Sequence, residues 1–262
     1  DVGISHEYLN SGTYTIKING IFESFSFAYT QNSDWYPEKI TKLYPIKNNS
    51  LKLINFQDCT SLTTLPNGLF SNLYNLINPS YCFNGCTSLE TVGDSLFEGC
   101  TNIKNFSNIF YQCESLTTIG DSLFEGCTNA TNLERCFYNC TSLTTIPSGL
   151  FSGLTNVTNF EGCFYNCTSL TSIPSDLFNG LTSVNNFSST FGYCESLTSI
   201  PNGLFDNNTI VENFNYAFYD CNMLTGNTPE LWSRTSPTPT GEQCFYNCTG
   251  LSNYDDIPSG WK

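Results

Sequence analysis

The chain has 262 residues, with 23 Asp and Glu against nine Lys and Arg, and a formal net charge of −14. Charged residues make up only 12 % of the chain and aromatic residues 15 %, which excludes a disordered acidic segment. An acidic chain repels the phosphate backbone, and no apolar run approaches the length of about 18 residues that a membrane span needs. We therefore expect an ordered protein with no nucleic-acid partner and no membrane insertion.

Residues 1–50 carry no repeat. They contain an alternating run of apolar and polar residues over Thr13–Gly20, followed by Phe22, Phe25 and Phe27. Such alternation predicts a β-hairpin. We expect residues 1–50 to form a cap that closes the N-terminal face of the core.

Residues 51–262 are built on a repeat of 27 residues, which is the signature of a solenoid. A Leu follows each repeat cysteine by three residues, and a Phe precedes it by three. We name these cysteines the cysteine ladder: Cys59, Cys86, Cys113, Cys140, Cys167, Cys194, Cys221 and Cys248. One unit cannot bury its own apolar face, so the units must stack, and we expect about seven coils.

Within one unit the apolar residues recur about every three positions, and Pro147 and Gly149 interrupt any single long helix. The spacing predicts a short strand over Leu143–Ile146, and over Leu170–Ile173 in the next unit. Short helical turns are expected over Gly-Leu-Phe-x-x-Leu and Cys-Phe-Tyr-Asn-Cys. The predicted fold class is therefore an α/β repeat solenoid, similar to leucine-rich repeats.

The repeat breaks down at the C-terminal end. The seventh unit replaces its apolar positions with Ser236–Gly241, a Pro- and Thr-rich run that predicts a stiff exposed loop. The eighth unit stops after Pro258. Solenoids need atypical terminal units, so we expect the C-terminal repeat to be a cap.

The repeat itself resembles a known family. The runs Cys-Phe-Tyr-Asn-Cys-Thr-Ser-Leu-Thr-Thr-Ile-Pro and Cys-Phe-Tyr-Asn-Cys-Thr-Ser-Leu-Thr-Ser-Ile-Pro are similar to the A-F-x-x-C-x-x-L-x-x-I-x-I-P unit of BspA-like leucine-rich-repeat surface proteins. The resemblance extends over residues 56–258, although the usual unit of that family is shorter. It implies an extracellular or cell-surface protein that adheres to host cells, matrix proteins or other microbes.

The fourteen cysteines invite a disulfide or a zinc interpretation. A second set, Cys82, Cys136, Cys163 and Cys244, lies four residues before a ladder cysteine, but other units place Ile109, Thr190 or Ala217 there. A disulfide partner or metal ligand could not be exchanged in that way, and the spacing matches no common zinc site. We expect most cysteines to be buried free thiols that form part of the core, with oxidation of some pairs as the alternative.

Catalysis has no support in the sequence. The single histidine, His6, lies outside the repeat, and no nucleophile elbow, phosphate-binding loop or zinc-protease motif is present. The repeated carboxylates Asp94 and Asp121 are replaced by Ser148 in a sister unit, which is typical of a turn position. We predict neither an enzyme nor a cofactor.

Binding residues are sought among polar and aromatic positions that recur outside the core period. The residue after the repeat Phe is usually Tyr, and the next is usually Asn; the candidates are Tyr111, Tyr138, Tyr165, Tyr219, Tyr246, Asn139 and Asn166. Gly192 and Tyr193 interrupt this series. Stacked by the solenoid, these side chains would form a stripe suited to a protein or glycan ligand. The alternative is that Tyr shields the edge of the core and Asn turns the backbone.

The leading hypothesis is an adhesin-like recognition module that binds a protein or glycan ligand on a cell surface along one rigid face. The alternatives are a structural spacer, a self-assembling fibre subunit, and a phage or fibre tip that reads a receptor. The sequence does not fix the oligomeric state.

Overall fold

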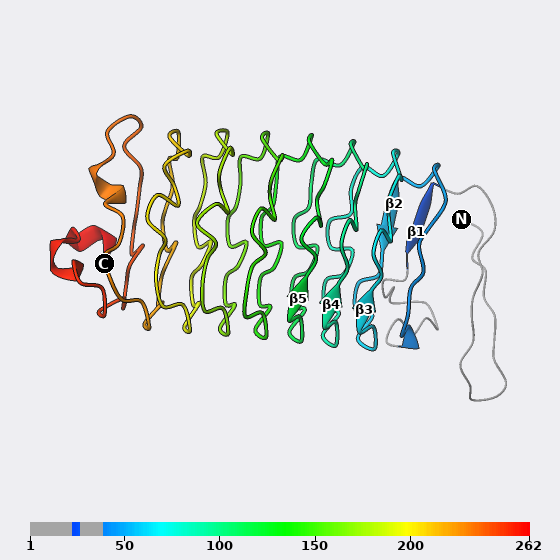
Figure 1. Ribbon diagram of the computed structural model, residues 1–262, viewed down its shortest axis with the longest axis horizontal. Coiled ribbons are helices and arrows are strands. Elements are labelled where there is room, and N and C mark those ends of the chain that lie inside the picture. Colours follow the sequence, from blue (N-terminus) through cyan, green and yellow to red (C-terminus); the bar gives the residue numbers. More distant parts are fainter. Residues whose placement is uncertain (1–22, 27–38) are drawn as a thin grey trace.

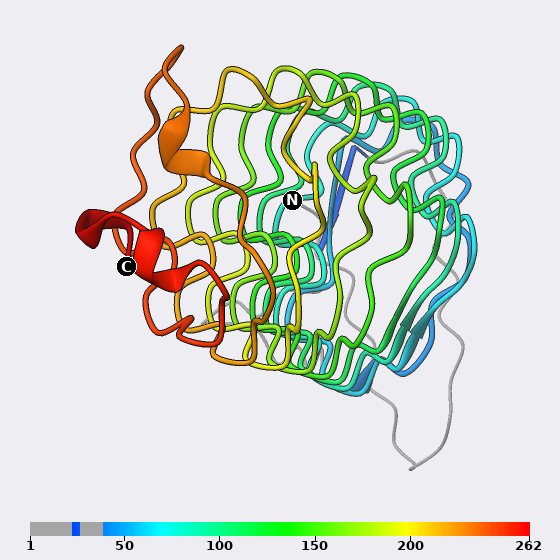
Figure 2. The same ribbon diagram turned by 60° about the vertical axis from the view of Figure 1, so that its left-hand side comes forward.

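The computed structural model describes residues 23–26 and 39–262. These residues form an elongated stack of coils that runs from the N-terminal end to the C-terminal end (Figure 1). Viewed more nearly along the stack, successive coils superimpose around a common interior (Figure 2). The repeat of 27 residues therefore corresponds to one coil.

Strand β1 (Ser24–Ser26) pairs in parallel with β2 (Leu53–Asn55), with Phe25 opposite Ile54. The backbone N–H of Lys52 also donates to the Glu23 carbonyl at 2.7 Å. Residues 23–26 thus continue the stack in the N-terminal direction. The hairpin expected over Thr13–Gly20 lies outside the described residues, so the N-terminal cap remains a prediction.

A second sheet has the order β3 (Thr64–Leu65), β4 (Thr91–Val92), β5 (Thr118–Ile119), and all its strands are parallel. These strands lie at the predicted position in three units. The strands predicted over Leu143–Ile146 and Leu170–Ile173 are not formed, which corrects that prediction.

Proline explains where this sheet ends. The N–H of Gly93 donates to the Leu65 carbonyl at 3.0 Å, and the N–H of Gly120 donates to the Val92 carbonyl at 2.9 Å. The next residue of this series is Pro147, which has no N–H to donate to Ile119. The next two units carry Pro174 and Pro201 at this position, so this row of hydrogen bonds ends at Gly120, while Thr171 and Thr198 still donate their N–H groups to the preceding coils at 3.1 and 3.3 Å.

The helical turns predicted in each coil are also wrong. Between residues 40 and 230 the chain contains turns and short strands but no helix. In the first complete unit, Ser71 donates its N–H to the Gly68 carbonyl, whereas Phe70 donates to Leu96 in the next coil, at 3.0 and 2.9 Å. Because alternate residues bond between coils, the i to i−4 pattern of an α-helix cannot form. The fold is a solenoid of β-turns and short strands.

The C-terminal end holds three short 3-10 helices, η2 (Leu231–Ser233), η3 (Tyr254–Asp256) and η4 (Ser259–Trp261). The carbonyls of Gly260 and Trp261 accept hydrogen bonds from Gln243 and Phe245, at 3.1 and 2.8 Å, in place of a further coil.

Two side chains close this end of the core. The Arg234 guanidinium donates to the carbonyls of Asn208 and Phe205 at 2.7 and 2.9 Å. The Trp261 ring lies where a side chain at Gly241 would project. Gly241 and Pro239 are buried, so the loop over Ser236–Gly241 is only partly exposed, in contrast to the prediction.

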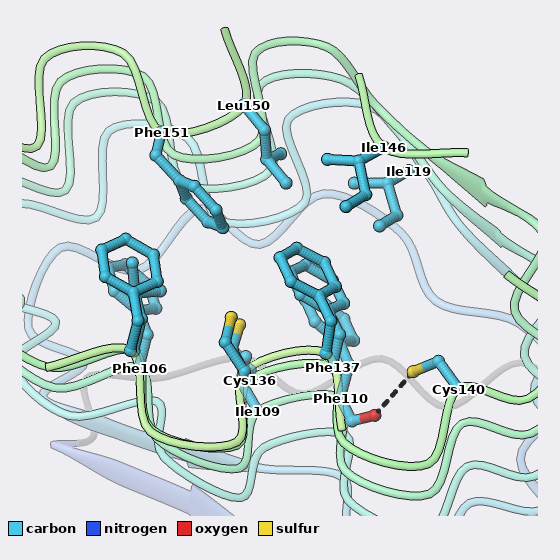
Figure 3. Packing of buried hydrophobic residues seen from close by; sticks show 14 of the residues in the cluster. Phe106, Ile109, Phe110, Ile119, Cys136, Phe137, Cys140, Ile146, Leu150 and Phe151 are labelled. Carbon is cyan, nitrogen blue, oxygen red and sulfur yellow. Dashed lines mark hydrogen bonds between the residues drawn. The ribbon is translucent and has the colours of Figure 1, made fainter. Parts of the chain in front are cut away.

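The core consists of columns of identical side chains. The Phe that precedes each ladder cysteine stacks on its counterpart in the next coil, with ring centroids 5.3–5.7 Å apart. These separations follow from the spacing of about 4.8 Å between parallel strands. Figure 3 shows Phe110 beneath Phe137, with Leu150 and Phe151 across the interior. Because each coil is completed by its neighbours, the apolar residues of the repeat are buried.

All fourteen cysteines are free and buried in the structure. From Cys86 onward, each ladder cysteine donates its Sγ–H to a Phe carbonyl of the preceding coil, at 3.0–3.3 Å. Figure 3 marks this bond between Cys140 and Phe110. Each of these carbonyls also accepts the backbone N–H of the cysteine in its own unit, so the thiol fills space in the core and supplies a second hydrogen bond to the carbonyl.

Candidate recognition surface

The five candidate tyrosines lie on one edge of the solenoid. Each follows a buried core Phe, so its backbone is fixed while its ring lies at the surface. The ring centroids of Tyr111 and Tyr138 are 4.8 Å apart, those of Tyr138 and Tyr165 are 4.7 Å apart, and the planes differ by only 12° and 13°. Tyr219 and Tyr246 repeat this arrangement at 4.8 Å. The structure therefore brings the predicted tyrosines together as stacked rings.

Tyr193 completes the series, in contrast to the prediction that it interrupts the series. Gly192 occupies the tyrosine position of its unit, and a Cβ there would lie 3.0 Å from the Tyr165 ring. The next residue, Tyr193, places its ring 5.2 Å from both Tyr165 and Tyr219. We name the six residues Tyr111, Tyr138, Tyr165, Tyr193, Tyr219 and Tyr246 the tyrosine stack. The signal for Tyr193 was the exchange of Tyr-Asn for Gly-Tyr in a single unit.

Stacking determines which parts of the rings are accessible. From Tyr111 to Tyr165, and between Tyr219 and Tyr246, the ring faces cover one another, so solvent reaches mainly their edges and hydroxyl groups. The Tyr193 ring instead meets its two neighbours at 65° and 48°. The rings are half-buried except that of Tyr246, which is 43 % exposed at the C-terminal end. Burial, together with the neighbouring Tyr138 and Tyr193, raises the pKa of Tyr165 to about 12. The hydroxyl of Tyr165 therefore remains a hydrogen-bond donor well above neutral pH.

Asn139 and Asn166 have a clear backbone role. Their φ angles are 63° and 58°, in the left-handed region that Asn, Asp and Gly adopt most readily. The equivalent residues of other coils share a positive φ, and they include Asp58, Gly85 and Asp220. The amide of Asn166 also donates to Oδ1 of Asn139 on the preceding coil. These contacts agree with the turn interpretation of the asparagine position, and its side chains still lie beside the tyrosine stack.

A second asparagine column was missed from the sequence. In each member, Oδ1 accepts the backbone N–H two residues later at 2.9–3.1 Å, and the members are Asn78, Asn105, Asn132, Asn159, Asn186 and Asn213. Parallel bridges join neighbours from Asn105 to Asn213. This is the Asx-turn geometry that makes Asn favourable at the start of a turn. Its signal was an Asn at a fixed repeat position directly before an apolar residue.

One cation lies beside the tyrosine stack. Arg135 approaches Glu134 and Glu161 at 3.9 and 3.8 Å, and these exposed pairs contribute little to stability. Gly162 provides the space for its side chain, because a Cβ there would lie 3.3 Å from Arg135 and 3.6 Å from the Tyr138 ring. Burial and the neighbouring Tyr111 raise the pKa of Tyr138. The charge of Arg135 lowers it by a smaller amount, so the pKa is raised overall.

Residues 23–26 and 39–262 hold neither a metal-binding cluster nor a membrane-spanning helix. No three His, Cys, Asp or Glu side chains there are grouped so that they could hold a metal ion. No helix in the same ranges is both long and apolar enough to cross a membrane. His6 lies outside the described residues. The tyrosine stack is therefore the candidate surface that combines the predicted residues with a defined geometry.

Solved structures that resemble this chain are distant. A chain of the Drosophila Toll–Spatzle complex (glycosylated form) is 23 % identical with a TM-score of 0.44, and the match covers 70 % of this chain and 22 % of that chain. A leucine-rich repeat protein of T. pallidum is 19 % identical, with a TM-score of 0.34 and coverage of 66 % and 75 %. One from Bacteroides ovatus ATCC 8483 is 18 % identical, with a TM-score of 0.24 and coverage of 82 % and 77 %. No curated protein matches the chain.

The repeat sequence gives a more direct result. A family model described as a BspA type leucine rich repeat region matches in six copies, over residues 15–131 and 80–251. These ranges cover most of the chain and contain the cysteine ladder from Cys59 to Cys248. The resemblance seen in the repeat motif is thereby confirmed: the chain belongs to the family of BspA-type leucine-rich-repeat proteins.

Proposed function

We propose that this chain is an extracellular or cell-surface recognition module that binds a protein partner through the edge formed by the tyrosine stack. The observation that carries the proposal is the continuity of the stack over six coils, maintained by Tyr193 where the tyrosine position is occupied by glycine. The family, whose members are associated with adhesion at cell surfaces, supports the location and the role.

The geometry favours a protein over a glycan at this edge. Sugars bind aromatic residues through the ring faces, and from Tyr111 to Tyr165 the faces between neighbouring rings are covered. The exposed edges and hydroxyls instead form a row of amphipathic contacts of the kind enriched in protein interfaces. Because the inner rings, such as that of Tyr138, are each held between two others, little side-chain entropy is lost when they bind. Many such contacts along a rigid edge suit a macromolecular partner.

The test is an array of extracellular proteins and glycans, probed with the purified chain and with a Tyr138→Ala/Tyr165→Ala variant. Buried tyrosines are frequent hot spots, so we expect saturable binding to a protein and a loss of at least about tenfold in affinity for the variant. A Tyr138→Phe/Tyr165→Phe variant keeps the rings and removes two hydroxyls, and so separates packing from hydrogen bonding. Thermal unfolding of all variants shows whether the fold is retained.

A matched control lies on the side of the same two coils where the earlier coils carry β3, β4 and β5. Thr144 and Thr171 are exposed, and a Thr144→Ala/Thr171→Ala variant should bind as the original chain does. Equal binding by the tyrosine variant would place the interface elsewhere and contradict the proposal. Absence of binding to any protein or glycan of the array would favour a structural spacer. Self-assembly of the chain that increases with its concentration would favour a fibre subunit.

A further inference from the structure

Positive charge is concentrated at one end of this acidic chain. Residues 39–57 contain Lys39, Lys42, Lys47 and Lys52 and no acidic residue, whereas residues 58–262 contain 18 Asp and Glu against four Lys and Arg. Charges separated by more than the Debye length of about 8 Å at physiological salt are largely screened from one another. Whether an anion is attracted to the N-terminal coils therefore depends on these lysines rather than on the net charge of the chain.

A pocket of about 340 Å³ lies in this region, lined by Ile46, Lys47, Asn49, Ser71 and Asn72. Two contacts hold its walls together: the N–H of Ile46 donates to the Leu69 carbonyl at 2.9 Å, and the Asn75 amide donates to the Asn49 carbonyl. We name it the N-terminal pocket. Its volume is in the range of sites that hold small ligands or single residues of a polymer.

An exposed tyrosine adjoins the pocket. The Tyr74 hydroxyl donates to Oδ1 of Asn72 at 2.9 Å, and the residue is 49 % exposed. Unlike the members of the tyrosine stack, Tyr74 makes no ring contact with another aromatic side chain of the described residues. Gly99 occupies the position of Asn72 in the next coil, and a Cβ there would lie 3.3 Å from Asn72 and 3.6 Å from the Tyr74 ring. The absence of that side chain leaves this side of the pocket open.

Lys47 is the cation available to a ligand. Lys52 is paired with Glu23 at 2.8 Å, and Lys42 lies 5.2 Å from the centre of the Tyr44 ring. Lys47 has no ion pair within residues 23–26 and 39–262. Glu98 lies on the next coil beside the pocket, where its backbone carbonyl accepts the N–H of Asn72 at 2.8 Å. An anion in the pocket would be attracted by Lys47 and repelled by Glu98.

We propose that the N-terminal pocket binds an acidic saccharide, one residue of a glycan that carries a carboxylate or a sulfate. Lys47 pairs with the anionic group, the amides of Asn49 and Asn72 bind sugar hydroxyls, and the exposed Tyr74 ring packs on the sugar face. This combination of aromatic, amide and ammonium groups matches the mixed apolar and polar surface of such a sugar. The site is separate from the tyrosine stack and does not depend on the function proposed for it.

The experiment titrates the full chain with oligosaccharides of hyaluronan, which carry carboxylates, and of heparin, which also carry sulfates. We expect saturable binding to at least one of them that weakens as salt is raised. Lys47→Gln should weaken this binding at least tenfold, and Tyr74→Ala should weaken it as well. Glu98→Gln should strengthen it by a few fold. Because Lys47→Gln and Glu98→Gln each remove one charge, their opposite effects identify the ligand as an anion bound between them.

Lys104→Gln is the matched control, since it removes an exposed lysine outside the pocket and should leave binding unchanged. The Tyr138→Ala/Tyr165→Ala variant should also bind the oligosaccharides normally, which keeps this site distinct from the tyrosine stack. Absence of binding to both oligosaccharides would overturn the proposal. So would binding that responds equally to Lys47→Gln and Lys104→Gln, because that indicates general charge attraction rather than a site.

Discussion

The middle coils and the N-terminal coils use the same residue types for different purposes. In the middle coils Tyr138 is enclosed between Tyr111 and Tyr165, whereas in the N-terminal coils Tyr44 and Tyr74 are 61 % and 49 % exposed. Cationic side chains are also concentrated in the N-terminal coils, because four of the eight described lysines and arginines lie within residues 39–52. Repetition stacks side chains on one another, and a pocket forms where the first repeat unit meets the non-repetitive segment before it.

This comparison predicts that the stability of the middle coils depends on columns of identical buried groups. The largest consequence concerns the thiols. The pKa is raised at twelve of the fourteen cysteines, and burial is the main cause at all of these but Cys86, where the hydrogen bond to Cys59 comes first. For Cys100 and Cys248 the pKa rises to about 12.

The first prediction is therefore steep unfolding at alkaline pH under reducing conditions. Above about pH 8.5 the unfolded chain loses thiol protons that the folded chain retains, so each shifted thiol removes about 1.4 kcal/mol of stability per pH unit until its folded pKa is reached. The effect is absent below the unfolded pKa. Since domains are stable by only about 5–15 kcal/mol, twelve thiols should unfold the chain within about one to two pH units. Circular dichroism against pH measures this transition.

A cysteine variant sharpens the test. Replacing Cys136 and Cys244 by Ala, the residue that Ala217 supplies at the same position, should reduce the dependence of stability on pH by about 2.8 kcal/mol per unit. Stability that stays constant between pH 8 and pH 10.5 would contradict the thiol argument and favour oxidised pairs. A count of free thiols with and without denaturant then distinguishes the two states.

The second prediction compares a middle coil with the last one. Leu143 is fully buried between coils on both sides, whereas Leu251 belongs to the final unit. Leu143→Ala should cost about 2–5 kcal/mol, because the neighbouring coils cannot collapse into the cavity, and Leu251→Ala should cost less. Urea unfolding of both variants measures the difference. Equal losses would show that the last unit is as tightly constrained as the middle ones.

The columns of the core could be predicted from the sequence, because an apolar residue that recurs every 27 positions must lie above its counterpart inside the stack of coils. The helical turns could not, since Gly68 and Asn72 take positive φ and alternate N–H groups bond between coils. The end of the second sheet at β5 could also have been predicted from the sequence, because Pro147 lacks the N–H donor that Gly93 and Gly120 supply. The N-terminal pocket combines Ser71 and Asn72 of the first repeat unit with Ile46, Lys47 and Asn49, which precede the repeat, so no period pointed to it.

The third and smallest prediction tests what the asparagines beside the tyrosine stack do. Asn139 has a φ of 63°, where Ala is strained and Gly is not. Asn139→Ala should cost about 1–2 kcal/mol, and Asn139→Gly should cost less, because only the amide contact with Asn166 is lost. Urea unfolding measures both variants. If Asn139→Gly keeps stability but loses binding to the partner of the tyrosine stack, Asn139 contacts that partner; if Asn139→Gly and Asn139→Ala destabilise equally, the amide contact outweighs the backbone conformation.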